Sequence, residues 1–215
     1  MKQNNMEFLD QNGRPVDWFP IKGVIFDVDG TLYHQKPVRL HMALRLGCHF
    51  FRHPTHIREL LGIYYFRKIR ETEKFRVLPL EEQIREAASR TGIHETQCLK
   101  AAIQRWMFDA PLPYIHSHQN RKMLCLLNWL RAEGKRILIY SDYAPERKLN
   151  VLDVKADAVY YPGTNGIDEL KPSGKSVRKI LDDQGFLPEE TVFIGDRPEK
   201  DGESARAAGI RFILV

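Results

Sequence analysis

The sequence predicts an α/β fold in which an all-helical segment interrupts a parallel sheet. Five short runs of apolar, β-branched and aromatic residues alternate with helical patterns. Such an alternation is typical of parallel strands joined by helical crossovers. After the first run the alternation stops, and residues 34–118 contain helical patterns without a convincing strand. A length of 215 residues allows one core with an insertion of this size.

The expected strands start with residues 21–26, which stay apolar up to Phe26 and stop at Asp27. The others are expected at residues 136–140, 156–161, 191–194 and 211–215. Helical patterns lie between them at residues 120–133, 146–152, 173–184 and 203–208. Strands connected in this way form a sheet that is covered by helices on both faces.

The interrupting segment is expected to form a helical cap. Helical patterns cover residues 38–45, 56–75, 80–90 and 94–108, with prolines and glycines between them. We therefore predict a discontinuous core, made of residues 1–33 and 119–215, and a cap made of residues 34–118. The lead-in of residues 1–20 has turn signals but no evident role.

The charge of the chain is concentrated in the same segment. The net charge is +5, and residues 34–118 hold 14 Lys and Arg against 8 Asp and Glu. A basic helical segment is compatible with a solvated surface, with an anionic substrate or with nucleic acid. Because the core is not basic and no nucleic-acid-binding motif is present, no nucleic acid is expected as a partner.

Compartment and assembly are predicted from what the sequence does not contain. No run of 18 apolar residues predicts a membrane span, and the N-terminal residues lack the pattern of a secretory signal. The three cysteines, Cys48, Cys98 and Cys125, are widely spaced, which suits a reducing cytoplasm better than a disulfide scaffold. The chain is expected to be a monomer or a homodimer.

Two carboxylates follow the first expected strand directly. Asp27 and Asp29 are separated by one residue, so an extended backbone would point both side chains the same way. Neighbouring carboxylates repel, and one pKa should rise unless a cation intervenes. Such a pair supplies a nucleophile or metal ligand beside an acid or base. The same residues with Gly30 are also compatible with a surface turn.

Polar residues also follow two later strands. Ser141 comes directly after residues 136–140, and Asp196 follows residues 191–194 with Asp201 five positions on. Lys171 lies between them and precedes a proline that can open a helix. Because ligands of α/β sheets gather at the carboxyl ends of the strands, these side chains are expected to meet at one edge.

Together these motifs resemble those of the haloacid dehalogenase-like hydrolases. The residues that carry the resemblance are Asp27-Val28-Asp29-Gly30-Thr31, Ser141, Lys171, and Gly195-Asp196 with Asp201. The resemblance implies a Rossmann-like, doubly wound parallel sheet. A helical insertion directly after the first motif resembles the subfamily in which a helical cap covers the active site.

The resemblance implies a phosphatase that works on a small phosphorylated metabolite. Asp27 would attack phosphorus and form an aspartyl-phosphate, and Asp29 would serve as acid and then as base. Family dehalogenases generally lack an acid at the position of Asp29, which favours phosphoryl transfer. Ser141 and Lys171 would hold the phosphoryl oxygens, and Lys175 is a second candidate for the role of Lys171.

The resemblance also implies Mg²⁺ as cofactor. Asp27, the backbone carbonyl of Asp29, and Asp196 would be ligands, with Asp201 ligating the ion or orienting a bound water. One hypothesis is that basic cap residues recognise a second anionic group on the substrate. A phosphomutase, or a catalytically silent regulatory or binding protein, are alternatives on the same fold.

Overall fold

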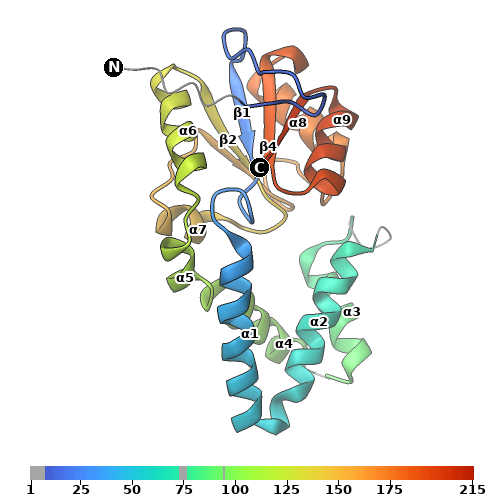
Figure 1. The fold of residues 1–215 in the computed structure, drawn as a ribbon. Helices are drawn as coiled ribbons and strands as arrows, with labels where there is room; N and C mark the ends of the chain where they lie inside the picture. The colour runs from blue at the N-terminus through green and yellow to red at the C-terminus, as the bar shows by residue number, and fades with distance from the viewer. Residues whose placement is uncertain (1–7, 73–76, 94) are drawn as a thin grey trace.

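The computed structural model describes residues 8–72, 77–93 and 95–215, and a five-stranded parallel sheet forms its centre (Figure 1). The strands are β1 (Gly23–Phe26), β2 (Arg136–Tyr140), β3 (Ala158–Tyr160), β4 (Thr191–Gly195) and β5 (Arg211–Leu214). Their order across the sheet is β3-β2-β1-β4-β5. The chain therefore starts in the middle, builds one side with β2 and β3, and then crosses to β4. The carboxyl end of β1 lies where the strand order reverses, which is the usual ligand position in such sheets.

The register aligns the ends of the central strands. Phe26, the last residue of β1, lies beside Ile139 of β2 and Ile194 of β4. Successive residues of a strand point to opposite faces. Val24 and Phe26 accordingly pack into one apolar cluster and Ile25 into another. The three strands thus end together at one edge, although both faces of the sheet are buried.

Helices cover the two faces separately. Leucines of α6 (Arg121–Ala132) and α7 (Glu146–Val151) pack in the cluster of Val24. Residues of α8 (Gly174–Gln184) and α9 (Glu203–Ala208) pack in the cluster of Ile25. Short turns of 3₁₀ and π helix, Pro188–Glu190 and Pro198–Gly202, lead into β4 and α9. This doubly wound sheet is the fold that the alternation of strands and helices predicts.

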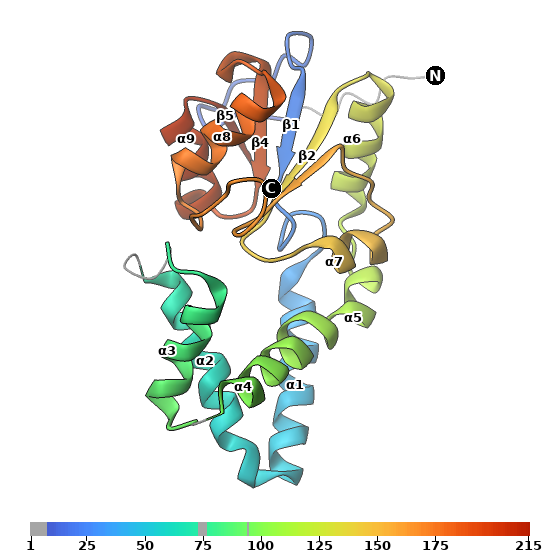
Figure 2. The same cartoon turned by 180° about the vertical axis from the view of Figure 1, so that it is seen from behind.

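The cap lies beyond the carboxyl edge of the sheet (Figures 1 and 2). Between β1 and β2 the chain forms α1 (Gln35–Arg52), a 3₁₀ turn (Pro54–His56), α2 (Ile57–Glu71), α3 (Leu80–Thr91), α4 (Thr96–Ile103), a π-helical segment (Gln104–Asp109) and α5 (Leu112–Ser117). The apolar cluster on the α6 face of the sheet continues through Leu32 and Val38 into the cap. The fold is therefore α/β with an inserted all-helical cap.

Several predicted boundaries were wrong, for local reasons. The helix expected at residues 38–45 extends through Gly47 to Arg52, because an exposed glycine in a long helix costs only about 1 kcal/mol. The helix α5 was missed because Pro111 and Pro113 were interpreted as breakers, although the first helical turn tolerates proline. The expected helix 56–75 ends at Glu71, and its residues 73–75 lie outside the described residues, as does His94 of the expected helix 94–108.

The lead-in packs against the core. Phe8 is buried, and Trp18 lies edge-on between its ring and that of Trp129 in α6, with ring centres 6.2 and 6.0 Å apart. The side-chain oxygen of Gln11 accepts a hydrogen bond of 2.6 Å from the backbone N–H of Phe212, in the edge strand β5. The lead-in therefore covers part of an exposed strand edge. Within the described ranges, no helix combines the length and the apolar character needed to cross a bilayer.

Candidate active site

The residues expected to meet at the sheet edge do so. Asp27 and Ser141 directly follow β1 and β2, and Asp196 directly follows β4. The backbone N–H of Asp27 donates to the carbonyl of Ile194, and that of Ser141 donates to Tyr160, so both positions continue the sheet pairing by one residue. Their side chains are therefore held by the sheet itself rather than by a mobile loop.

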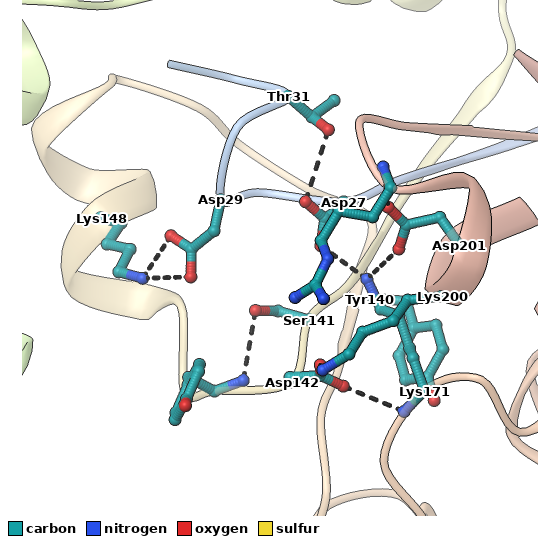
Figure 3. Close-up of polar contacts among 12 residues, drawn as sticks. Asp27, Asp29, Thr31, Tyr140, Ser141, Asp142, Lys148, Lys171, Lys200 and Asp201 are labelled. Carbon is teal, nitrogen blue, oxygen red and sulfur yellow. Dashed lines mark hydrogen bonds and ion pairs between the residues drawn. The ribbon is translucent and has the colours of Figure 1, made fainter. Parts of the chain in front are cut away.

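Asp27, Lys171 and Asp201 form a buried charge cluster (Figure 3). The ammonium nitrogen of Lys171 lies 2.5 Å from Oδ1 of Asp27 and 2.7 Å from Oδ1 of Asp201. Lys171 is 2% exposed, and its backbone N–H donates to Oδ1 of Asp142 at 3.0 Å. Burial opposes the charge of Lys171, but Asp201 and Asp27 outweigh it and hold its pKa well above the ordinary value. Lys171 therefore retains its positive charge within the cluster.

The pKa of Asp27 is raised, although a neighbouring lysine ordinarily lowers the pKa of a carboxyl group. Burial raises its pKa to about 8, and the charges of Asp201 and Asp29 add to this effect against the attraction of Lys171. The hydroxyl of Thr31 lies 3.4 Å from Oδ2 of Asp27 and donates to it. A second cation at this point would favour the ionised carboxylate.

Asp29 has a lysine of its own, which the sequence did not identify. Lys148 of α7 lies 2.5 and 2.7 Å from the two carboxylate oxygens, and the Tyr33 hydroxyl donates to Oδ1 at 2.5 Å. Burial acts to raise the pKa of Asp29, but Lys148 and Tyr33 outweigh it, so the pKa lies below its ordinary value. Because β1 ends at Phe26, strand alternation does not place Asp29, and Figure 3 shows its carboxylate turned toward Lys148.

Three carboxylates at the edge can together hold a cation. Oxygens of Asp27, Asp196 and Asp201 lie within 4.8 Å of one another. Oδ1 of Asp196 is buried without a hydrogen-bond partner among the described residues, and burial, with the charge of Asp201, raises the pKa of Asp196 to about 6. Gly30 makes room for this cluster, since a Cβ there would lie 1.9 Å from Oδ2 of Asp196. An all-oxygen set with an unsatisfied oxygen fits Mg²⁺.

Ser141 lies beside these charges. It is 1% exposed, and its Oγ accepts a hydrogen bond of 3.3 Å from the backbone N–H of Tyr143. That contact leaves the hydroxyl proton available as a donor. Lys175, the second candidate for the role of Lys171, instead lies on the surface and pairs with Glu169 at 2.9 Å. The structure therefore brings Lys171, and not Lys175, to the site.

A cavity of about 310 Å³ opens between the sheet edge and the cap. Five of the six predicted site residues line it, namely Asp27, Asp29, Ser141, Lys171 and Asp201. Asp196 is not part of the lining and lies against Gly30. The cap side contributes basic and apolar side chains from α1, α2 and the π-helical segment. A volume of this size suits a small ligand.

The end of α2 connects the cap to the sheet edge. The guanidinium of Arg70 donates to the backbone oxygen of Asp142 and lies 4.3 Å from the centre of the Tyr143 ring. The carboxylate of Glu71 lies 3.3 Å from the ammonium of Lys200. Arg70, Tyr143 and Lys200 all line the cavity, and the sequence reasoning did not identify them. For Arg70 the sequence signal is the basic character of α2, whereas nothing in the sequence pattern distinguishes Tyr143 or Lys200.

The chain matches the haloacid dehalogenase-like hydrolase family over residues 21–209. This protein belongs to that family.

Solved structures of the family share the fold. A magnesium-bound structure of a protein described as the HAD-hydrolase YfnB, from Bacillus subtilis, superposes with a TM-score of 0.62 at 15% identity, over 89% of this chain and 87% of the other. A 2-haloacid dehalogenase from Pseudomonas syringae has a TM-score of 0.60 at 19% identity, over 89% and 85% of the two chains. A predicted phosphoglycolate phosphatase from Haemophilus somnus has a TM-score of 0.52 at 15% identity, over 91% and 85%. At these sequence identities the structural similarity establishes the fold alone, and the three proteins are named for different activities.

Proposed function

We propose that this protein is a Mg²⁺-dependent phosphatase that hydrolyses a small phosphorylated metabolite through an aspartyl-phosphate on Asp27. The observation that carries the proposal is the presence of two carboxylates, Asp27 and Asp29, in one cavity with separate lysine partners. A nucleophile and a proton carrier need different surroundings to keep different roles. An acid at position 29 favours phosphoryl transfer over dehalogenation within this family.

The reaction follows from the positions of these side chains. A carboxylate oxygen of Asp27 attacks phosphorus as the bond to the leaving oxygen breaks, and Asp29 gives that oxygen a proton. Asp29 then takes a proton from a water molecule that attacks the phosphorus of the aspartyl-phosphate. Asp27 is released and inorganic phosphate leaves. The contact with Lys148 holds Asp29 ionised in the free protein, so the proton that Asp29 passes to the leaving oxygen arrives with the substrate, as the proton of its phosphate monoanion.

The remaining site residues stabilise charge on the phosphoryl group. Lys171 brings a fixed positive charge to within 2.5 Å of Asp27, and Ser141 offers its hydroxyl proton from the neighbouring strand end. Asp27, Asp196 and Asp201 would hold Mg²⁺, with the backbone carbonyl of Asp29 as a further ligand. When bound, Mg²⁺ neutralises charge on the phosphoryl oxygens.

In the proposed function, the cap covers the active site. We assign residues 1–33 and 119–215 to the catalytic core and residues 34–118 to the cap. A cover that excludes water strengthens the charge interactions beneath it and protects the acyl-phosphate from side reactions. The contact of Arg70 with Asp142 and that of Glu71 with Lys200 support a cap that closes on the core.

The test is phosphate release from a panel of phosphomonoesters, comparing the wild type with Asp27→Asn. We expect the substitution to reduce kcat/KM by at least about 10³-fold, because it removes the nucleophile, and we expect EDTA to abolish release in the wild type. Asp182→Asn, on the exposed face of α8, is the matched control and should retain activity. Release that survives Asp27→Asn would contradict the mechanism. Phosphate exchange between positions of a substrate without release would favour a phosphomutase.

A further inference from the structure

Cations line both walls of the cavity, and those on the sheet side are paired with carboxylates. Lys171 contacts two carboxylates, and Lys148 contacts one. Lys200 lies 3.4 Å from Asp142 and 3.3 Å from Glu71. Arg197 contacts Glu199 at 2.9 Å. Every one of these charges is therefore at least partly compensated by the protein.

The cap wall is different. Arg39 of α1 and Arg67 of α2 line the same cavity, and neither has a hydrogen bond or an ion pair to any residue in the described part of the chain. Arg70 is 5% exposed, and it contacts an amide oxygen of Gln83 and a backbone oxygen, but no carboxylate in the described ranges of the chain. Its Nε is buried without a partner among the described residues. A buried guanidinium without an anion is costly, so this wall has unmatched positive charge.

Apolar side chains line the cap wall beside these arginines. Met42, Ile63, Trp106 and Phe108 belong to the same cavity lining. Trp106 is 7% exposed, so its ring is held in place by the surrounding helices. The cavity thus combines apolar side chains with charged groups on both walls, as ligand sites commonly do.

We propose that the substrate has a second anionic group, a carboxylate or a phosphate, which Arg39 and Arg67 bind while the phosphoryl group lies at Asp27. The inference rests on the proposed function for the phosphoryl end only. Guanidinium groups bind carboxylate and phosphate through paired N–H donors, which accounts for arginine at both positions. Arg70, which contacts Asp142 and Tyr143, adds positive potential to the same cavity. The substrate class is therefore a small phosphomonoester that bears a second anionic group.

Binding of two matched phosphonates tests this directly. Benzylphosphonate has one anionic end and 4-carboxybenzylphosphonate has two, and neither is hydrolysed. By titration calorimetry with Mg²⁺ present, we expect the wild type to bind the carboxylated compound about 10- to 100-fold more tightly, as for charge-assisted hydrogen bonds. The double variant R39Q/R67Q should reduce this ratio to within about 3-fold. Lys68→Gln, an exposed neighbour on α2 outside the cavity lining, should leave the ratio unchanged.

A third compound, 1,4-xylylene bisphosphonate, distinguishes the two anions. If it binds more tightly than the carboxylated compound, the second group is a phosphate, and the reverse order indicates a carboxylate. Equal dissociation constants for all three compounds in the wild type, or a ratio that survives in R39Q/R67Q, would overturn the proposal and leave the arginines as solvated surface charges.

Failure of the proposed function is measured separately. Phenyl phosphate has no second anionic group, so its hydrolysis by the wild type reports on the sheet edge alone. If phenyl phosphate and 4-carboxyphenyl phosphate both remain intact, the phosphatase proposal fails, whereas the binding ratio still decides the second anion site. If phenyl phosphate is hydrolysed but the binding ratio is about one, only the second anion site is wrong.

Discussion

The two walls of the cavity hold similar numbers of basic side chains in different surroundings. At the sheet edge Lys171 is 2% exposed and bonded to Asp27 and Asp201. On the cap wall Arg39 and Arg67 are exposed and have no such contact within the described residues. A buried ammonium needs carboxylates around it, whereas an exposed guanidinium is solvated and remains available. The difference suggests that one wall is organised for chemistry and the other for recognition.

The carboxylates of the sheet edge are packed directly against the backbone. At the sheet edge, Cβ atoms added to Gly30 and Gly195 would lie 1.9 Å from an oxygen of Asp196 and 2.4 Å from one of Asp201. The geometry of these carboxylates is therefore determined by the strand ends.

The largest effect is expected from Lys171→Met, a change of similar length that removes the charge. In the metal-free protein, Asp27 and Asp201 would lose their shared cation, and we expect the free energy of unfolding to fall by about 3–5 kcal/mol. Lys175→Met, at the exposed lysine four residues away, should change it by less than about 0.5 kcal/mol. Urea unfolding of both EDTA-treated variants provides the measurement.

The same unfolding measurement with Mg²⁺ present provides a second comparison. If the carboxylates hold Mg²⁺, the ion should stabilise Lys171→Met more than the wild type, because it replaces a missing positive charge. A Lys171→Met protein as stable as the wild type would show that the cluster does not need its cation, and the contrast between the two walls would lose its main support.

The sequence could predict the sheet edge because strand ends are visible in it. A strand pattern that stops at Asp27, and others that end before Ser141 and Asp196, place three polar residues at one edge without any knowledge of side-chain contacts. Parallel pairing then determines their proximity. The roles assigned to these residues stay predictions.

Residues that reach the cavity from helices could not be predicted in this way. Lys148 lies in the short helix α7, and nothing in its spacing distinguishes a lysine that turns inward from a solvated one. Arg70 and Tyr143 meet across 73 positions of the chain, through the packing of α2 against the loop after β2. Such contacts depend on how the cap lies on the core, which local patterns do not encode.

A smaller effect is expected from Gly30→Ala. Gly30 has a φ of +104°, which side chains rarely adopt, and the new methyl group would displace the carboxylate of Asp196. Backbone strain of this kind costs about 1–3 kcal/mol, and the displaced ligand should also weaken Mg²⁺ binding, measured by calorimetry. Gly47→Ala is the matched control, since it has open space in the exposed part of α1 and should be neutral or slightly stabilising. Unchanged Mg²⁺ affinity in Gly30→Ala would remove Asp196 from the proposed ligand set.

The last comparison concerns pH, because burial raises the pKa values of two sheet-edge carboxyl groups, Asp27 and Asp196, toward neutrality. The pKa of Asp27 is raised from 3.8 to about 8 in the folded, metal-free protein. Its contribution to stability is therefore complete below about pH 4 and is lost as the pH rises to about 8, with a slope of at most about 1.4 kcal/mol per pH unit. Asp27→Asn should lack this slope, so the difference in unfolding free energy between wild type and variant should change between pH 5 and 8 in EDTA.

With Mg²⁺ the pH dependence of stability should reverse, because ion binding requires the ionised carboxylate and becomes tighter as the pH rises. Parallel pH profiles for the two proteins in EDTA would show that Asp27 is already ionised without the metal, and Lys171 alone would then stabilise its charge.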